Sequence, residues 1–185
     1  MLKRFFIFII LLFGCKKIDQ EGREIFTIKE GAHHSRHKFK TTKSTLINFK
    51  VIFDKSSTYT INSSDQADVN KLLGVSDHKQ YHMDHSIRFG WRYYNNKLEI
   101  LWFKHEEGQF TFGHIDYIKP DEEYLCTILI EPDEYTLFVD DVFVTVPRVR
   151  SRYCFKSINY SRYFLWPYFG GNCAAPHDIK IKIKL

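Results

Sequence analysis

Hydrophobic and polar residues alternate along most of this chain, and the alternation is clearest from His85 to His105, on either side of Asn95-Asn96. One set of alternate positions holds Ile87, Phe89, Trp91, Tyr93, Leu98, Ile100 and Trp102. The other set holds Arg88, Gly90, Arg92, Tyr94, Glu99, Leu101 and Phe103. A period of two indicates strands with two different faces, and paired asparagines tolerate the left-handed backbone of a two-residue turn. We therefore predict a β-hairpin with one face in the core and the other open to a ligand.

The same alternation predicts further strands at Glu24–Lys29, Thr45–Phe53, Gln109–Ile118, Tyr124–Ile130, Tyr135–Val139, Val142–Val146, Tyr163–Phe169 and Ile179–Leu185. The apolar run Tyr124–Ile130 is expected to be central, and the lysines of the last strand are expected to discourage edge pairing. Asp68–Gly74 is the one segment expected to form a helical turn, with Asp68 and Gly74 as its caps. Many short strands with little helix predict an all-β, jelly-roll type sandwich as a single domain, residues 24–185.

The N-terminus has the pattern of a targeting segment. Lys3 and Arg4 precede the apolar run Phe5–Phe13, which is too short to span a membrane as a mature helix. The run ends in Leu-Phe-Gly-Cys15, which resembles a bacterial lipobox, although Phe13 is bulkier than the usual residue there. The resemblance implies removal of residues 1–14, acylation of Cys15 and a short tether over residues 15–23. It also implies a lipid-anchored protein of the bacterial cell envelope, at the outer membrane; the alternative is an ordinary signal peptide with an incidental cysteine.

The composition is typical of a β-protein and gives no sign of a nucleic-acid-binding or cofactor-binding protein. Aromatic residues make up 17% of the chain, which favours half-buried pleated surfaces. The net charge of +5 is spread out, with no basic stripe or zinc-finger spacing, so we expect no nucleic-acid partner. No cofactor motif is present. Cys126 lies in an apolar run and is expected to be a buried thiol, whereas Cys154 and Cys173 are the candidate disulfide pair in an oxidising compartment.

Two further segments resemble a known fold. Tyr-Thr-Leu-Phe-Val-Asp-Asp, residues 135–141, is similar to the strand and turn of concanavalin-A-like and laminin-G-like jelly rolls, with Asp141 in place of glycine. Trp-Pro-Tyr-Phe-Gly-Gly, residues 166–171, and the strand after it are similar to the closing strands of that superfamily, which includes polysaccharide lyases. Residues 24–185 also resemble uncharacterised lipoproteins of Bacteroidota-type bacteria. The resemblance implies fold and compartment, but a fold alone does not imply an activity.

A histidine-rich loop is a candidate metal site. His78, His82 and His85 are spaced so that their imidazoles could bind zinc together with Asp77 or Asp84. The spacing is not His-Glu-x-x-His, and no glutamate stands where that chemistry needs a base. A polar loop without a metal is the favoured interpretation.

The polar face of the hairpin is the candidate ligand-binding site. Its residues are Arg88, Arg92, Tyr94 and Glu99, to which His105 and His114 are added. Jelly-roll alginate lyases use arginines, a histidine and a tyrosine for β-elimination on uronates. Here glycine replaces the glutamate of their Arg-x-Glu-x-Arg strand, and their Gln-Ile-His and C-terminal tyrosine motifs are absent. The alternative is that the arginines pair with Glu99 and other carboxylates on a solvated face.

Aromatic residues offer a second kind of recognition, because sugar rings stack on exposed aromatic planes. The candidates are Trp91, Trp102, Trp166, Tyr93, Tyr94, Tyr168 and Phe169, most of which we expect in the core. The loop with His33, His34 and Arg36 is expected to border the same surface. We therefore expect a non-catalytic, lipid-anchored sandwich that binds a polysaccharide or another surface ligand. The alternatives are a polysaccharide lyase or glycoside hydrolase, and a structural envelope protein whose large aromatic residues are all buried.

Overall fold

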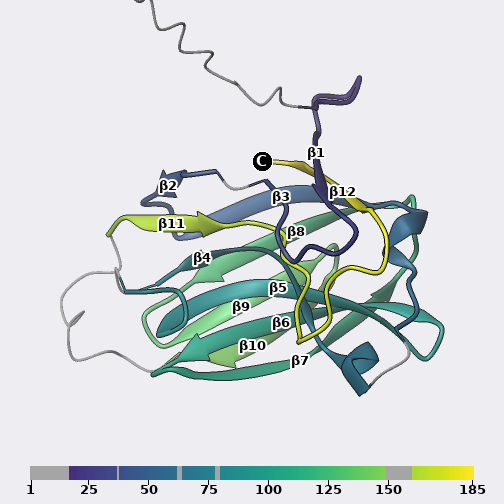
Figure 1. Cartoon of the computed structure of the whole chain (residues 1–185). Helices are drawn as coiled ribbons and strands as arrows, with labels where there is room; N and C mark the ends of the chain where they lie inside the picture. Colours follow the sequence, from purple (N-terminus) through teal and green to yellow (C-terminus); the bar gives the residue numbers. More distant parts are fainter. Residues whose placement is uncertain (1–16, 37, 62–63, 78–79, 149–159) are drawn as a thin grey trace, which may run out of the picture.

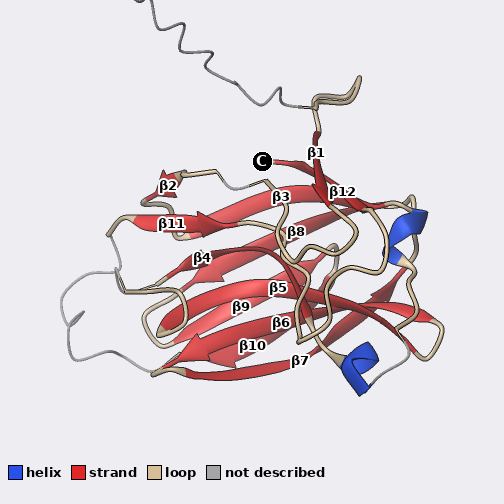
Figure 2. Cartoon of the chain, in the orientation of Figure 1, coloured by secondary structure: helices blue, strands red, loops and turns tan. Residues whose placement is uncertain are grey.

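A computed structural model of the chain describes residues 17–36, 38–61, 64–77, 80–148 and 160–185. Two antiparallel six-stranded sheets lie face to face (Figures 1 and 2). The predicted lipidation site Cys15, the candidate metal ligand His78 and the candidate disulfide partner Cys154 lie outside the described residues. Over the described ranges, no helix has the length and hydrophobicity to span a bilayer.

The strands of each sheet come from distant parts of the chain. Sheet A contains, in spatial order, β1 (Glu24–Ile28), β12 (Ile179–Lys184), β3 (Leu46–Phe53), β8 (Glu123–Ile130), β9 (Glu134–Val139) and β10 (Val142–Pro147). Sheet B contains β2 (Thr41–Thr42), β11 (Arg162–Leu165), β4 (Asn70–Ser76), β5 (His85–Tyr94), β6 (Lys97–Glu106) and β7 (Gln109–Ile118). The predicted all-β sandwich is confirmed, and β8 is central in sheet A as expected.

Both predicted hairpins are present. Asn95 and Asn96 have φ of 50° and 59°, the left-handed pair that a type I′ turn requires. The turn sets the register of β5 on β6 so that Arg92 lies opposite Glu99. In the second hairpin, β9 and β10 meet at Asp140, whose φ is 48°.

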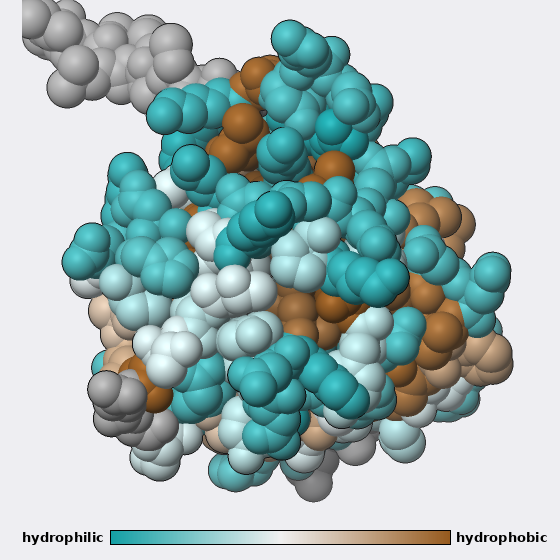
Figure 3. All heavy atoms as spheres, turned by 90° about the vertical axis from the view of Figure 1, so that its right-hand side faces the viewer, coloured by the Kyte–Doolittle hydropathy of each residue, from teal (hydrophilic) through white to brown (hydrophobic). Residues whose placement is uncertain are grey.

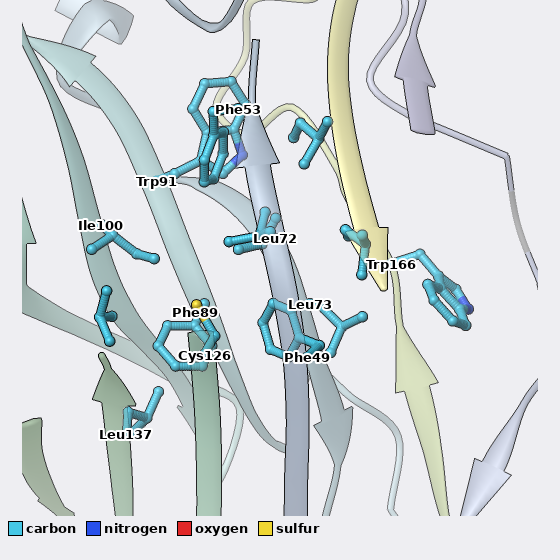
Figure 4. Packing of buried hydrophobic residues seen from close by; sticks show 14 of the residues in the cluster. Phe49, Phe53, Leu72, Leu73, Phe89, Trp91, Ile100, Cys126, Leu137 and Trp166 are labelled. Atoms are coloured by element: carbon cyan, nitrogen blue, oxygen red, sulfur yellow. The ribbon is translucent and has the colours of Figure 1, made fainter. Parts of the chain in front are cut away.

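The inward row of the β5–β6 hairpin fills the core between the sheets. Phe89 and Trp91 are fully buried and point toward sheet A (Figure 4). The ring centroids of Phe49 and Phe89 are 5.6 Å apart, and those of Phe53 and Trp91 are 5.4 Å apart. Cys126 is also fully buried in this core, as expected, and burial raises the pKa of its thiol well above the usual range. The predicted core face is therefore confirmed.

The predicted helical turn at Asp68–Gly74 is wrong. Residues Asn70–Ser76 form strand β4, which pairs with both β5 and β11. The helical geometry lies earlier, in the 3-10 turn η2 (Ser64–Ala67); the other 3-10 turn described, η1, spans Lys55–Ser57. Strand pairing prevails because Gly74 is a poor helix former and its missing side chain lets β5 approach closely: a Cβ there would lie 2.2 Å from the carbonyl oxygen of Ile87.

The expected role of the final strand is also corrected. β12 pairs with β1 on one side and β3 on the other, so it is an interior strand of sheet A and its lysines do not protect an edge. Its isoleucines are buried, and Lys180, Lys182 and Lys184 lie on the outer face of the sheet. The edges of the sandwich among the described strands are β1 and β10 in sheet A and β2 and β7 in sheet B.

Candidate functional site

The outer face of sheet B carries most of the residues that the sequence singled out. Because Ile87, Phe89 and Trp91 point into the core, the alternate residues of β5 point away from it. The register places Arg88 opposite Phe103, and Arg92 opposite Glu99. β4 and β7 flank this hairpin, so the face is four strands wide (Figure 1).

One group on this face is a fully paired charge cluster. Glu99 is only 5% exposed, and its two carboxylate oxygens accept from Arg92 Nε at 2.6 Å and pair with His114 Nδ1 at 2.7 Å. The Arg92 guanidinium also donates to the carbonyl oxygen of Ala67 and lies over the ring of Tyr94, 5.1 Å from its centroid. The structure thus brings four of the six candidate binding residues together. The alternative interpretation, in which the arginines of this face pair with carboxylates, is therefore correct for Arg92.

Arg88 is in a different environment. It is 7% exposed, and its Nη2 donates to the backbone carbonyl oxygen of Trp166 at 2.7 Å. Its Nε has no hydrogen-bond partner, and the described residues place no carboxylate within ion-pair distance of it. Burial lowers the pKa of Arg88 to about 9, because the charged form loses hydration that no anion replaces. The aliphatic stem of Arg88 occupies the space above Gly74, where a Cβ would lie 2.7 Å from Arg88 Cγ.

Lys71 of β4 is a second cation on the same face, and sequence reasoning missed it. Its Nζ donates to the carbonyl oxygen of Val69 at 2.8 Å and lies 4.5 Å from the centroid of the Phe103 ring. Burial, followed by the charge of Arg88, lowers the pKa of Lys71 to about 8. We call these two residues the Arg88–Lys71 pair.

His105 adjoins this pair. Burial lowers the pKa of His105 to about 4, and the charges of Arg88 and Lys71 add to the effect, so the imidazole is neutral at pH 7. Its Nδ1 lies 3.4 Å from the hydroxyl of Ser86. A neutral imidazole can accept or donate a hydrogen bond. The remaining two candidate residues of the polar face, Arg88 and His105, therefore form a site distinct from the paired cluster.

The loops beside β4 border the same site, as the sequence led us to expect for His33 and His34. Tyr168 exchanges backbone hydrogen bonds with Lys71, and its ring contacts those of His33 and His34 with centroids 5.5 and 4.9 Å apart. Arg36 points elsewhere, to an ion pair with Glu24 at 3.2 Å.

Exposed phenylalanines lie along the edge strand β7, and the sequence analysis did not select them. Phe110 and Phe112 are 60% and 42% exposed. Their rings lie nearly parallel to that of Phe103, with centroids 5.6 and 6.2 Å from it. The alternation in Gln109–His114 was the available signal, since it places both phenylalanines on the face of His114. The ring of Trp102 points to the opposite, inner face of the sheet and lies over Gly113. A Cβ on Gly113 would lie 2.5 Å from the indole nitrogen. We call Phe103, Phe110 and Phe112 the aromatic strip.

The other aromatic candidates are mostly in the core, as expected. Trp91, Trp166 and Phe169 are buried, whereas Tyr94 is 38% exposed. Several further large hydrophobic side chains remain exposed, and Figure 3 shows such residues gathered between polar ones on one side of the molecule.

Among the described residues, the candidate metal ligands do not come together as a metal site. Over the described ranges, no three His, Cys, Asp or Glu side chains lie together as metal ligands would. The backbone N–H of His82 donates to the Tyr163 hydroxyl, and His85 begins β5. Asp77 is fully buried, and its carboxylate accepts hydrogen bonds from Arg148, Tyr135 and Tyr160. The carboxylate of Asp77 is therefore occupied by protein partners.

Comparison with solved structures identifies the type of β-sandwich. Neither the family models nor the curated protein sequences contain a match. Among solved structures, the alginate lyase AlyC3 matches with a TM-score of 0.59 and 11% identity over 91% of this chain and 75% of that one. The fold is a jelly-roll β-sandwich. A Bacteroides ovatus mixed-linkage glucan GH16 protein in complex with its product matches with a TM-score of 0.55 and 10% identity, over 90% of this chain and 81% of that one.

The neighbours of this jelly roll also include a protein described as a pseudo-glucanase. A pseudo β-1,3-glucanase and immunostimulatory antigen of Mycobacterium tuberculosis matches with a TM-score of 0.53 and 12% identity, over 89% of this chain and 73% of that one. At these identities the likeness concerns the fold alone, and a fold does not determine an activity.

Proposed function

We propose that this chain is a lipid-anchored protein of the bacterial cell envelope that binds an acidic polysaccharide on the outer face of sheet B without cleaving it. The observation that carries the proposal is the Arg88–Lys71 pair, two cations on one face that form no ion pair with a carboxylate among the described residues. The carbohydrate-related jelly-roll neighbours support the ligand class.

The energetics of the pair favour an anionic ligand. A buried charge without a counter-ion is costly, and two neighbouring cations add repulsion to that cost. A carboxylate beside Arg88 and Lys71 offsets both penalties, because it supplies the counter-ion that the described residues do not. A hydrogen bond to a charged group contributes about 1.5–3 kcal/mol, which corresponds to roughly ten- to hundredfold in affinity.

The aromatic strip supplies the second requirement of a sugar site. Phe110 and Phe112 present exposed ring faces on the strand next to β6, on the same face as the Arg88–Lys71 pair. Sugar rings pack their apolar C–H faces against such planes. These exposed rings disfavour the structural alternative, which predicted that every large aromatic side chain is buried.

The paired state of Glu99 favours binding over glycoside hydrolysis. Glycosidases protonate the leaving group with a carboxylic acid that faces the glycosidic oxygen. Arg92 and His114 bond directly to the two oxygens of Glu99, so both oxygens are already taken by protein partners. Glu99 is therefore poorly suited to act as a general acid.

A polysaccharide lyase is the second candidate, and one observation favours it. Neutral His105 lies near Arg88, and Tyr168 lies beside Lys71, so a charge-neutralising cation, a base and a tyrosine share one face. Lyase activity would appear as unsaturated uronate in the ultraviolet, and His105→Ala and Arg88→Ala would each abolish it. The same assay with His114→Ala tests whether the paired cluster takes part.

Affinity electrophoresis of the full chain through gels containing acidic or neutral polysaccharides tests the proposal. We expect retardation by uronate-containing polymers and little by neutral glucans. Equal mobility in every gel contradicts the proposal. Retention of intact polymer length after incubation separates binding from cleavage.

A further inference from the structure

The first described residues are fixed to the domain. The backbone N–H of Ile25 donates to the carbonyl oxygen of Lys17 at 2.8 Å, so the chain turns back beside the start of β1. Arg23 closes this turn: it is 8% exposed and pairs with Asp19 at 2.8 Å and with Glu123 of β8 at 2.9 Å. The described part of the predicted tether is therefore a structured turn.

This geometry limits the distance between the domain and a lipid on Cys15, an acylation that belongs to the proposed function. An extended chain spans at most about 3.6 Å per residue, so the Cα atoms of Cys15 and Lys17 lie no more than about 7 Å apart. The end of the sandwich where β1 begins must then lie at the bilayer surface.

A row of lysines runs along β12 from that end, beginning at Lys184. Lys180, Lys182 and Lys184 point to the outer face of sheet A, because the isoleucines between them are buried. The register pairs Lys182 with Ile25 and Lys180 with Thr27 of β1. Figure 1 shows β1 and β12 together at one edge of the sandwich.

The lysine row has no counter-ion among the described residues. Lys184 Nζ donates to the backbone oxygen of Glu21, and no ion pair joins Lys180 or Lys182 to a described carboxylate. The nearby acid Glu123 is already paired with Arg23 and with Lys50 at 2.6 Å. Asp19 and Glu21 pair with Arg23, and Asp178 pairs with Lys29, so the lysines of β12 are left without an ion pair among the described residues at this end of sheet A.

We propose that the outer face of β1 and β12 rests on an anionic bilayer surface, with Lys17 and the three lysines of β12 over the lipid phosphates. Each lysine near such a surface contributes about fivefold in affinity. In this orientation the outer face of sheet A is turned to the membrane, and the outer face of sheet B, with the Arg88–Lys71 pair, is turned away from it toward the ligand.

Lysine labelling of the acylated full chain tests this orientation. The protein is reconstituted in vesicles of phosphatidylethanolamine with phosphatidylglycerol, or of phosphatidylcholine alone, and treated with an amine-reactive reagent. Mass spectrometry reports the rate at each lysine, and exposed Lys97, the first residue of β6 in sheet B, serves as the matched control. Mass spectrometry of the intact chain establishes acylation of Cys15 separately.

We expect labelling of Lys180 and Lys182 to be at least tenfold slower in the anionic vesicles than in detergent, with Lys97 unchanged. The protection should disappear in phosphatidylcholine and in about 1 M salt, where the Debye length is about 3 Å. Unprotected lysines on an acylated chain overturn the inference and leave the ligand site untouched. Protection that persists in phosphatidylcholine also overturns it, because charge would then play no part. An unacylated chain overturns the anchor itself.

Discussion

Arg88 and Arg92 lie four residues apart on the same face of strand β5, but their physical roles differ. Arg92 has the carboxylate of Glu99 as a partner, whereas Arg88 has one backbone carbonyl and a free Nε–H. Replacing an unpaired buried charge by an apolar side chain of similar length removes a desolvation penalty, whereas removing one partner of a buried pair leaves the other charge uncompensated.

We predict opposite effects of the two Arg→Met substitutions on stability. Arg88→Met should leave the free energy of unfolding in urea unchanged or raise it. Arg92→Met should lower that free energy by about 1–3 kcal/mol, since Glu99 then keeps only His114. Comparable losses in both variants would mean that Arg88 is a structural residue.

Lys71 makes the binding depend on pH. Its pKa of about 8 lies below the ordinary value of 10.5, so its positive charge is lost as the pH rises through about 8. Affinity for an acidic oligosaccharide should fall over that range, and Lys71→Arg should move the fall up to about pH 9, where Arg88 loses its own charge. Titrations between pH 6 and 10 measure this; identical profiles for both proteins would exclude Lys71 from the site.

The same shift gives a stability prediction of defined sign. Between about pH 8 and pH 10.5 the unfolded chain binds a proton at Lys71 that the folded chain has lost. The free energy of unfolding should therefore rise with pH over this window, and Lys71→Met should remove the part of the rise between about pH 8 and 9, below the folded pKa of Arg88. Urea unfolding at several pH values reports the difference between the two proteins.

Sequence reasoning reached Arg88, Arg92, Glu99 and His114 because alternation assigns residues to a face. It could not separate Arg88 from Arg92, because the difference depends on the Trp166 carbonyl, which is far away in the sequence. Lys71 was missed for another reason: its segment was assigned to a helical turn, and only pairing with β5 shows that it is a strand.

At the scale of elements, the β5–β6 hairpin positions the site, and its turn fixes the register. Asn96 has φ of 59°, a conformation that costs a β-branched residue about 1–2 kcal/mol. Asn96→Val should lower the free energy of unfolding by about that amount, whereas Asn96→Gly should leave it unchanged or raise it. Equal stabilities of these two variants would contradict the type I′ assignment.

The fold elements show where local pattern suffices and where it does not. Gln109–Ile118 was predicted with its observed bounds, because alternation and the flanking turn residues agree. The interior position of β12 depends on its pairing with β3, more than 100 residues away in the sequence. The assignment of β4 as a strand depends on its bulged pairing with β5. Such long-range pairing leaves little trace in the local sequence.

At the scale of the whole molecule, a buried charge network joins the two sheets. Asp77 follows β4 of sheet B, and Arg148 Nε, just after β10 of sheet A, donates to it at 2.7 Å. Tyr135 of β9 and Arg162 of β11 complete the network. Burial alone would raise the pKa of Asp77, but the bonds and charge of Arg148 outweigh it and hold that pKa well below its usual range.

We predict that Asp77→Asn lowers the free energy of unfolding by about 3–5 kcal/mol, because two buried arginines lose their anion. In the natural chain this stabilisation is present above the unfolded pKa of about 3.9 and is lost as the pH falls below it toward the folded pKa. Asp178→Asn, which breaks the exposed pair with Lys29, is the control and should cost about 0–1 kcal/mol. A small loss in Asp77→Asn would contradict the structural role of the network.

The most direct test of the account is a calorimetric titration of the full chain, and of its Arg88→Met variant, with an acidic oligosaccharide and a neutral one of equal length. We expect the natural chain to bind the acidic oligosaccharide at least tenfold more tightly than the neutral one. The Arg88→Met variant should lose that preference while remaining folded. Equal affinity of the natural chain for both ligands, or an unchanged preference in the variant, would contradict the proposal that the Arg88–Lys71 pair binds an anionic sugar.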